Sequence, residues 1–287
     1  MAKLYVVGTP IGNFGDLSPR AKEVLTSCQL IAAEDTRITK GLLTHFGIST
    51  PCISNHRHNE EGRAGQIVQR MQEEDIDVAL VTDAGMPGIS DPGSFLVDEA
   101  IRAGIEVLSV PGPSAMASAL SVSGFDTRTF AFYGFPPRKP GELRSFLKQI
   151  SRGPVPVAVL HESPHRVIDL VKEIAETIPE TYISASCDLT KLYEKTIRGT
   201  AGKVLEMLQA NEKAEKGEYC LVLDMHEVPA PEQTVPQVSA ELQLLSLMMD
   251  GADLNTAAVQ LRQQGLKRNE LYAAKEKVKA LLEGRLE

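Results

Sequence analysis

Short apolar runs alternate with helical patterns through the first four-fifths of the chain, and this alternation limits the fold more than any other feature. The runs are LYVVG, LIAAE, DVALVT, IEVLSV, TFAFYGF, PVAVLHE, TYISAS and YCLVLDM. A repeated order of strand and then helix indicates an α/β protein. Helix starts are well marked, for example at Ser18 and Pro19, because a serine hydroxyl caps a helix and proline fits its first position.

Breaks in this pattern predict the domain organisation. With 287 residues the chain is long enough for two domains and a small appendage. The alternation pauses near SVSGFDTR, and VPAPEQTVP, with three prolines in nine residues, is typical of a linker. Beyond the linker only helical spacing remains. We expect a first α/β domain over 1–121, a second over 122–228, a linker over 229–236 and a helical domain over 237–287.

Composition predicts a soluble protein. Hydrophobic residues make up 43% of the chain and charged residues 24%. No apolar run approaches the roughly 20 residues of a membrane helix, and the amino terminus does not have the apolar length of a signal peptide. We therefore expect a cytoplasmic protein with no membrane association. The net charge of -8 argues mildly against nucleic-acid binding, but a local basic patch is enough for binding.

The four cysteines predict neither a metal site nor disulfides. Cys28, Cys52, Cys187 and Cys220 stand far apart and form no C-x-x-C pair. We interpret all four as small buried apolar residues, and we expect no metal.

Three of the predicted strands end in loops rich in glycine and proline. These loops lie in VVGTPIGNFGDLSPRA, VTDAGMPGISDPG and SVPGPSAMASAL. Ligands of α/β sheets bind at the carboxyl ends of strands, so the three loops are expected to gather at one sheet edge. Glycine lets the main chain approach a ligand closely, and proline stiffens the loop beforehand. The loops match neither the dinucleotide fingerprint nor a P-loop, which argues against a phosphate cradle.

These loops resemble those of the tetrapyrrole methylase-like, class III S-adenosylmethionine methyltransferases. Four further segments, AEDTR, SNHRHNE, FYGFPPRK and HESPHR, resemble the bacterial small-subunit ribosomal RNA ribose 2'-O-methyltransferase I family. The resemblance extends over essentially the whole chain. It implies two α/β domains of the tetrapyrrole methylase type, with the cofactor in the cleft between them, a small C-terminal helix-turn-helix-like domain, and a homodimer.

The resemblance also implies which residues hold the cofactor, S-adenosylmethionine. The matching positions are Pro10 in the first loop, Gly85, Met86, Pro87, Gly88 and Ile89 in the second, and Ser114 and Ala115 in the third. One position departs from the tetrapyrrole enzymes. Met86 stands where their G-D-P sequence has an aspartate, and the acidic role is then expected to pass to Asp83.

The segment AEDTR offers two carboxylates for catalysis, Asp35 and Glu34. Asp35 stands where a helix begins, so a capping role is one interpretation. Ribose methylation supplies another, because a hydroxyl that attacks a methyl group must lose its proton and a carboxylate can accept it. Both interpretations of Asp35 remain open at this point, with Glu34 as the rival base.

Candidate RNA contacts lie in four places. They are Arg37 in AEDTR, His56 in SNHRHNE, Arg138 and Lys139 in FYGFPPRK, and Lys267 and Arg268 in the C-terminal region. SNHRHNE is equally interpretable as a surface turn, and the C-terminal helices as a plain packing unit. FYGFPPRK combines cations with aromatic side chains, which suits phosphates and unpaired bases. Between Arg128 and Arg152, six cations face one anion, Glu142.

Together the sequence and the resemblance predict an enzyme that methylates a cytidine 2'-hydroxyl in 16S ribosomal RNA or the small ribosomal subunit. Two alternatives are a tetrapyrrole carbon methyltransferase and a non-catalytic RNA-binding assembly factor. A small macrocycle needs neither the helical appendage nor the basic aromatic segment, which disfavours the first of them.

Overall fold

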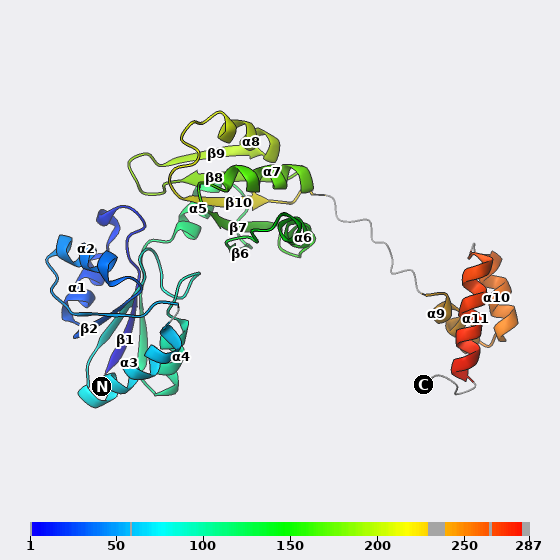
Figure 1. The fold of residues 1–287 in the computed structure, drawn as a ribbon, viewed down its shortest axis with the longest axis horizontal. Coiled ribbons are helices and arrows are strands. Elements are labelled where there is room, and N and C mark those ends of the chain that lie inside the picture. The colour runs from blue at the N-terminus through cyan, green and yellow to red at the C-terminus, as the bar shows by residue number, and fades with distance from the viewer. Residues whose placement is uncertain (1, 58, 229–238, 264–265, 283–287) are drawn as a thin grey trace. The chain divides into compact units, whose positions relative to one another are not determined.

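The computed structural model describes residues 2–57, 59–228, 239–263 and 266–282 of the chain. These residues form two compact units, Met1–Val228 and Pro229–Glu287, and each is described by itself. The linker expected over 229–236 lies outside the described residues. The first unit contains two separate sheets, and the second consists of helices (Figure 1). The α/β class predicted from the sequence, with C-terminal helices, is confirmed.

The first sheet is parallel throughout, with the strand order β3-β2-β4-β1-β5. Its strands are β1 (Lys3–Val7), β2 (Leu30–Ala33), β3 (Cys52–Ser54), β4 (Val78–Val81) and β5 (Glu106–Val110). The connecting helices are α1 (Pro19–Ser27), α2 (Thr36–Phe46), α3 (Glu60–Glu74) and α4 (Ser94–Arg102), with a short 3-10 helix, η1 (Phe14–Asp16), before α1. Because the strands are parallel, their carboxyl ends lie at one edge of the sheet.

Both faces of this sheet are covered, which explains why its central strands are apolar throughout. Alternate residues of β2 point to opposite faces, so Ala32 joins the core beneath α3 and α4 and Ile31 joins the core beneath α1 and α2. All four residues of β2 and of β4 are buried. A layer of helices therefore covers each face of the sheet, and the loops that follow the strands begin at its carboxyl edge.

The second sheet is mixed, with the order β6-β7-β10-β8-β9. Its strands are β6 (Ala131–Gly134), β7 (Val157–Glu162), β8 (Tyr182–Cys187), β9 (Lys195–Thr200) and β10 (Tyr219–Asp224). Only β6 and β7 are paired in parallel. Helices α6 (Pro140–Ser151), α7 (Val167–Thr177) and α8 (Ala201–Gln209) cover one face through a large apolar core.

Helix α5 (Ala115–Ser123) covers the other face of the second sheet. Its Ala119 and Leu120 pack with Val159 and Val222 of that sheet. The residues just before the expected boundary at 121 and 122 thus share a core with the second sheet, and the boundary itself stays a prediction. Since α5 follows the last strand of the first sheet, it directly links the first sheet's carboxyl edge to the second sheet.

Two strands were not predicted, β3 and β9. Both lie at sheet edges, and neither contains a fully buried residue. An edge strand packs on fewer neighbours, so its sequence does not need a continuous apolar run. β9, with the sequence KTIRGT, carries charged and small residues instead.

The interpretation of all four cysteines as buried was wrong for two of them. Cys28 and Cys220 are buried, but Cys52 and Cys187 are only partly so, because they lie at the ends of β3 and β8. Burial raises the pKa of the Cys28 and Cys220 thiols to about 12. All four thiols are free.

The second unit is built from three described helices, α9 (Ala240–Met249), α10 (Leu254–Gln263) and α11 (Arg268–Leu282). Their shared core includes Leu244, Leu261, Leu271 and Val278. Ser239 caps α9 by accepting a hydrogen bond from the Leu242 N–H at 3.3 Å. Gly265, which precedes α11 in the sequence, lies outside the described residues. No described helix in the chain is both long and apolar enough to span a membrane.

Candidate active site

The three loops rich in glycine and proline follow β4, β1 and β5, which are neighbours in the first sheet. A pair of main-chain hydrogen bonds between Thr9 and Gly85 joins the first loop to the second, at 2.9 and 3.1 Å. Gly8 and Gly112 bring the first loop against the third. A Cβ atom on Gly112 would lie 2.7 Å from the Gly8 backbone, so only glycine permits this contact. The predicted gathering of the loops at one edge is therefore present.

The second loop, residues 84–93, is held from the side by the segment SNHRHNE. The Arg57 guanidinium donates a hydrogen bond to the Ser90 carbonyl at 3.0 Å. The Gly93 N–H donates to the buried Glu60 carboxylate at 2.8 Å. Ser90 adopts a φ of 69°, an uncommon backbone conformation for a serine. The two contacts give SNHRHNE a structural task in addition to the alternatives that its sequence left open.

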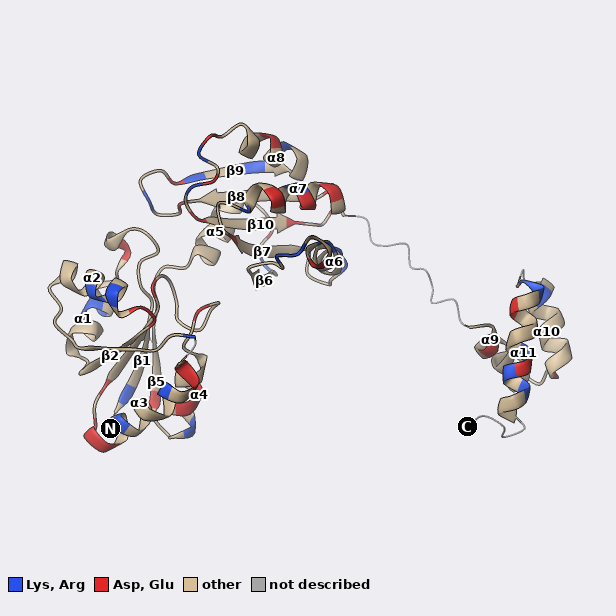
Figure 2. Cartoon of the chain, viewed as in Figure 1, with Lys and Arg blue, Asp and Glu red and all other residues tan. Residues whose placement is uncertain are grey.

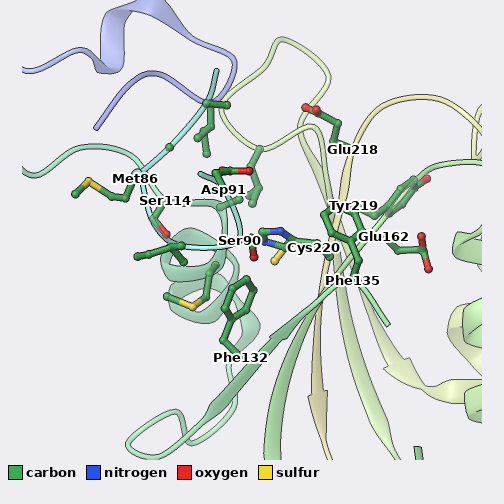
Figure 3. Close-up of a pocket in the computed structure, with 18 of the residues that line it drawn as sticks. Met86, Ser90, Asp91, Ser114, Phe132, Phe135, Glu162, Glu218, Tyr219 and Cys220 are labelled. Atoms are coloured by element: carbon green, nitrogen blue, oxygen red, sulfur yellow. The ribbon is translucent and has the colours of Figure 1, made fainter. Parts of the chain in front are cut away.

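A cavity of about 390 Å³ lies between these loops and the second sheet (Figure 3). From the first half of the unit it is lined by Ile11, Ala84, Gly85, Met86, Ile89, Ser90, Asp91, Ser114, Ala115 and Met116. From the second half it is lined by Phe132, Phe135, His161, Glu162, Ser163, Pro164, Leu189, Glu218, Tyr219 and Cys220. Its volume and its largely apolar walls are typical of small-molecule sites.

The wall contributed by the second sheet combines aromatic rings with an imidazole. His161 packs edge to face against Phe132 and Phe135, with ring centroids 5.1 and 5.7 Å apart. Burial lowers the pKa of His161, so the ring is neutral near pH 7. Its Nε2 atom is buried, and no described residue forms a hydrogen bond with it. A ligand in the cavity thus meets aromatic rings beside a polar ring atom that no described residue uses.

The predicted cofactor residues fall into two groups. Gly85, Met86, Ile89, Ser114 and Ala115 line the cavity. Pro10, Asp83, Pro87 and Gly88 are absent from its lining, and Ile11 stands there in place of its neighbour Pro10.

Asp83 has a visible structural role at the same sheet edge. Its carboxylate accepts a hydrogen bond from the Asp35 N–H at 3.0 Å, which ties the end of β4 to the end of β2. Burial raises the pKa of Asp83. The idea that Asp83 takes over an acidic contact with the cofactor therefore has no support from its position.

The two carboxylates expected as bases also lie outside the cavity lining. Asp35 is the N-cap of α2 and accepts a hydrogen bond from the Arg37 N–H at 2.8 Å. Its carboxylate is also paired with the Arg37 guanidinium, 2.6 Å away, and this partner lowers the pKa of Asp35 to about 2. Glu34 accepts a hydrogen bond from the Asp83 N–H at 3.3 Å, and burial raises its pKa. For Asp35 these contacts favour the capping interpretation over the base.

We expect Asp35→Asn to lower stability near pH 7 and to leave methyl transfer nearly unchanged. Asparagine retains the capping oxygen but loses the charge that Arg37 binds. A carboxyl whose pKa is lowered on folding stabilises the protein above its unfolded pKa, and this contribution disappears as the pH falls towards the folded value of about 2. Urea unfolding of both proteins should therefore show a difference that shrinks between about pH 4 and pH 2. A large loss of rate at unchanged stability would restore Asp35 as the base.

Five of the six predicted RNA contacts are exposed, and two of these five are already paired. Arg37 pairs with Asp35, and Lys139 pairs with Glu142 at 2.9 Å. In the basic stretch, Arg128 pairs with Asp126 and Arg144 with Glu173. The expectation that this stretch faces only one anion was therefore wrong, because folding brings Glu173 of α7 beside α6.

Arg138 keeps an exposed charge, with no ion pair to another described residue. Phe132 and Phe135, whose segment was expected to contact RNA, line the cavity instead. Lys267 and Arg268 are exposed at the start of α11, and the side chain of His56 is partly buried. None of the six candidate RNA contacts lines the cavity.

Most of the wall that the second sheet contributes carried no signal in the sequence. HESPHR is one of the segments that carry the family resemblance, and its His161 and Glu162 end β7 and line the cavity. Leu189 and the segment from Glu218 to Cys220 gave no comparable signal. The positive φ values of Asp188 and Thr190 shape the turn that carries Leu189, and neither residue is a glycine that would have marked it.

Comparison with known proteins explains this arrangement of loops. Residues 3–205 match the family model of the tetrapyrrole (corrin/porphyrin) methylases. The chain belongs to this family. The solved structure of uroporphyrin-III-C-methyltransferase from Thermus thermophilus shares the fold, with a TM-score of 0.54 and 20% identity over 78% of this chain and 94% of that one.

Closer relatives bear the name ribosomal RNA small subunit methyltransferase I. The protein from Xylella fastidiosa is 38% identical, covering 89% of this chain and 92% of its own length. The protein from Escherichia coli O157:H7 is 39% identical, covering 94% and 93%. The chain is therefore a methyltransferase of this group, and enzymes of the group take their methyl group from S-adenosylmethionine.

One relative of the same name is shorter. The Hydrogenobaculum protein is 41% identical over 221 residues, which are 77% of this chain and 95% of that protein. It has no room for a second unit of the size of residues 229–287.

Proposed function

We propose that this chain methylates the 2'-hydroxyl of a cytidine ribose in the 16S ribosomal RNA of the small ribosomal subunit, with S-adenosylmethionine as the donor. The assignment of the substrate rests on the similarity, over about nine-tenths of the chain, to proteins named as small-subunit ribosomal RNA methyltransferases. The cavity beside the three loops supports the assignment of S-adenosylmethionine as the donor.

The cavity fits the donor in size and in chemistry. Its volume of about 390 Å³ lies within the range of small-molecule sites. Gly85 and Ala115 offer backbone close to the lumen, and the buried Nε2 of His161 offers a polar atom that no described residue uses. When bound, the sulfonium donor supplies an activated methyl group. We propose that Gly85, Met86, Ile89, Ser114 and Ala115 hold it, and that the rings of Phe132 and Phe135 exclude water.

The protein's part in the reaction is mainly to position the hydroxyl and to remove its proton. Holding two reactants in line can lower a barrier by roughly 7 to 11 kcal/mol, and a general base adds about 10² to 10⁴ in rate. No metal is needed for this chemistry. The described residues contain no group of three or more metal-ligating side chains close enough to bind one.

RNA contact is proposed for five exposed cations and for the partly buried His56, all outside the cavity lining. The six residues are Arg37, His56, Arg138, Lys139, Lys267 and Arg268. Because ribosomal subunits are cytoplasmic, we propose the same location for the enzyme.

We further propose a homodimer. Leu192 and Tyr193, in the loop between β8 and β9, are 87% and 81% exposed, and a second copy of the chain would remove such side chains from water.

The test is to incubate the full chain with methyl-labelled S-adenosylmethionine and, in parallel, small ribosomal subunits, protein-free 16S RNA or a tetrapyrrole. We expect label in the RNA of the subunit, at a cytidine whose ribose resists alkaline cleavage, since a 2'-O-methyl group blocks that reaction. Label in the tetrapyrrole would favour a carbon methyltransferase instead. Absence of label from every acceptor, with RNA binding intact, would favour a non-catalytic factor.

A further inference from the structure

Three carboxylates line the cavity, and their surroundings differ. Glu162 is buried, accepts a hydrogen bond from the Ser163 N–H at 2.7 Å, and is paired with Arg166 at 3.4 Å. Glu218 is paired with Lys191 at 2.7 Å, and its side chain is 77% exposed. The carboxylates of Glu162 and Glu218 are therefore each already engaged by a cation of the protein.

Asp91, the third carboxylate, has no hydrogen bond or ion pair to its side chain from any described residue. It is half-buried, and Figure 3 draws it between the loop residues Met86 and Ser114 and the residues of the second sheet. Burial raises the pKa of Asp91, Arg57 opposes this effect, and Asp83 adds to it. Because no cation of the described residues pairs with it, this carboxylate is free to accept a hydrogen bond from a ligand hydroxyl in the cavity.

The loop that carries Asp91 is held on both sides of the residue. Ser90, directly before it, receives the hydrogen bond from Arg57, and Gly93, two residues after it, donates to Glu60. The Gly88 N–H also donates to the Pro92 carbonyl at 3.3 Å, which closes the loop upon itself. A base must be held within hydrogen-bond reach of the proton that it removes, and these contacts supply such a fixed position.

We propose that Asp91 is the general base of the methyl transfer, an inference that rests on the proposed function. The ribose O–H bond breaks and its proton passes to the Asp91 carboxylate. At the same time the ribose oxygen forms a bond to the methyl carbon, the carbon–sulfur bond breaks, and its electron pair remains on sulfur, which becomes an uncharged thioether. The proton on Asp91 then passes to water. This assigns to Asp91 the role that the sequence had suggested for Asp35 or Glu34.

The first experiment compares Asp91→Asn with Asp98→Asn. Asp98 lies on α4 nearby and is paired with Arg102 at the surface, so its variant controls for the loss of one carboxylate. We expect single-turnover methylation of small subunits to fall about 10² to 10⁴-fold in Asp91→Asn and to stay at the parent level in Asp98→Asn. Calorimetry should give nearly the parent affinity for S-adenosylhomocysteine in both variants.

The pH dependence separates a base from a positioning residue. The charged and titratable groups around Asp91 lie on both sides of the cavity: Arg57, Asp83 and Glu34 on its own side, and His161, Glu162, Glu218, Tyr219 and Cys220 across it. The parent rate should rise with pH through the pKa of Asp91 and then level off, whereas the residual rate of Asp91→Asn should lack that rise. In Asp91→Ala, added formate should restore part of the rate, because a free carboxylate then takes the place of the missing one.

A readout without turnover uses the same residue. In the cofactor-free protein, the ¹³C signal of the Asp91 carboxyl, identified by its absence from Asp91→Asn, should titrate above the ordinary aspartate value of about 3.9. The assignment is overturned by a parent-like rate in Asp91→Asn, by a loss that follows cofactor affinity, by an unchanged acid limb, or by a signal that titrates below the ordinary value. If the parent labels no RNA, the proposed function fails first. If Asp91→Asn labels RNA at the parent rate, the proposed function stands and only the assignment of Asp91 as the base is overturned.

Discussion

Gly85→Val is expected to lower the affinity for S-adenosylmethionine by about 100-fold, equivalent to about 2.7 kcal/mol, while the protein stays folded. Gly85 lies in the cavity wall and adopts a φ of 80°, which β-branched residues rarely accept. A Cβ atom there would already lie 3.7 Å from Ile11 and from the Pro113 carbonyl oxygen. The two further methyl groups of valine therefore have to enter the cavity or displace the neighbouring loops.

The matched control is Gly104→Val. Gly104 has a similar φ of 74°, but it is exposed after α4, and a Cβ atom added to it would meet no other atom within 4 Å. Both variants carry the backbone strain of about 1 to 2 kcal/mol, and only the first changes the cavity. Calorimetric titration of both proteins, with their melting temperatures, separates the two effects. Equal affinities in Gly85→Val and Gly104→Val would place the cofactor elsewhere.

Four of the five strands of the first sheet could be predicted from the sequence because the pattern that marks them is local. Each buried parallel strand is an apolar run, and each loop that faces the ligand needs glycine or proline for its backbone. The sequence could not reveal that the loops after β1, β4 and β5 are the neighbouring ones, since strand order depends on pairing between distant segments. The general rule that ligands bind at the carboxyl ends of strands predicted that the loops gather at one edge, and the contact between Gly8 and Gly112 confirms it.

The wall from the second sheet was much less predictable. Phe132, Phe135 and Tyr219 are ordinary strand residues by sequence, and only the packing of α5 against β10 brings their end of the sheet to the cavity. The choice among carboxylates stays a prediction, and the sequence could not rank them for a similar reason. Asp35 follows a buried strand and looks well placed, but its ion pair with Arg37 and its absence from the cavity lining become visible only in three dimensions. Asp91 belongs to the loop that the family resemblance assigns to the cofactor, but its own position matched no expected role.

The α11 helix offers a surface suited to RNA. Arg268, Tyr272 and Lys279 are exposed and recur at helical spacing, so they share one face, and Tyr272 is 70% exposed. An exposed ring flanked by cations can stack on an unpaired base while the cations bind phosphates. Figure 2 shows Lys and Arg at the start of α11 and along its length, with acidic residues between them. The unit thus has a candidate binding face of its own, separate from the cavity residues.

A chain that ends at Val228 should fold, bind S-adenosylmethionine with the parent affinity and lose much of its efficiency on small ribosomal subunits. The first unit keeps every residue of the cavity and both of its sheets, and the second unit has its own apolar core. The short Hydrogenobaculum relative indicates that a member of the family can do without such a unit.

We expect kcat/KM for the subunit to fall about 10-fold or more through a higher KM, since each lost base stack is worth about 1 to 3 kcal/mol. The full-length variant Tyr272→Ala should show part of the same rise in KM, and Met249→Ala, which removes another exposed apolar side chain of this unit, should not. If the shortened protein methylates subunits with the parent KM, the helical unit has no part in RNA binding, and the exposed face of α11 serves another purpose.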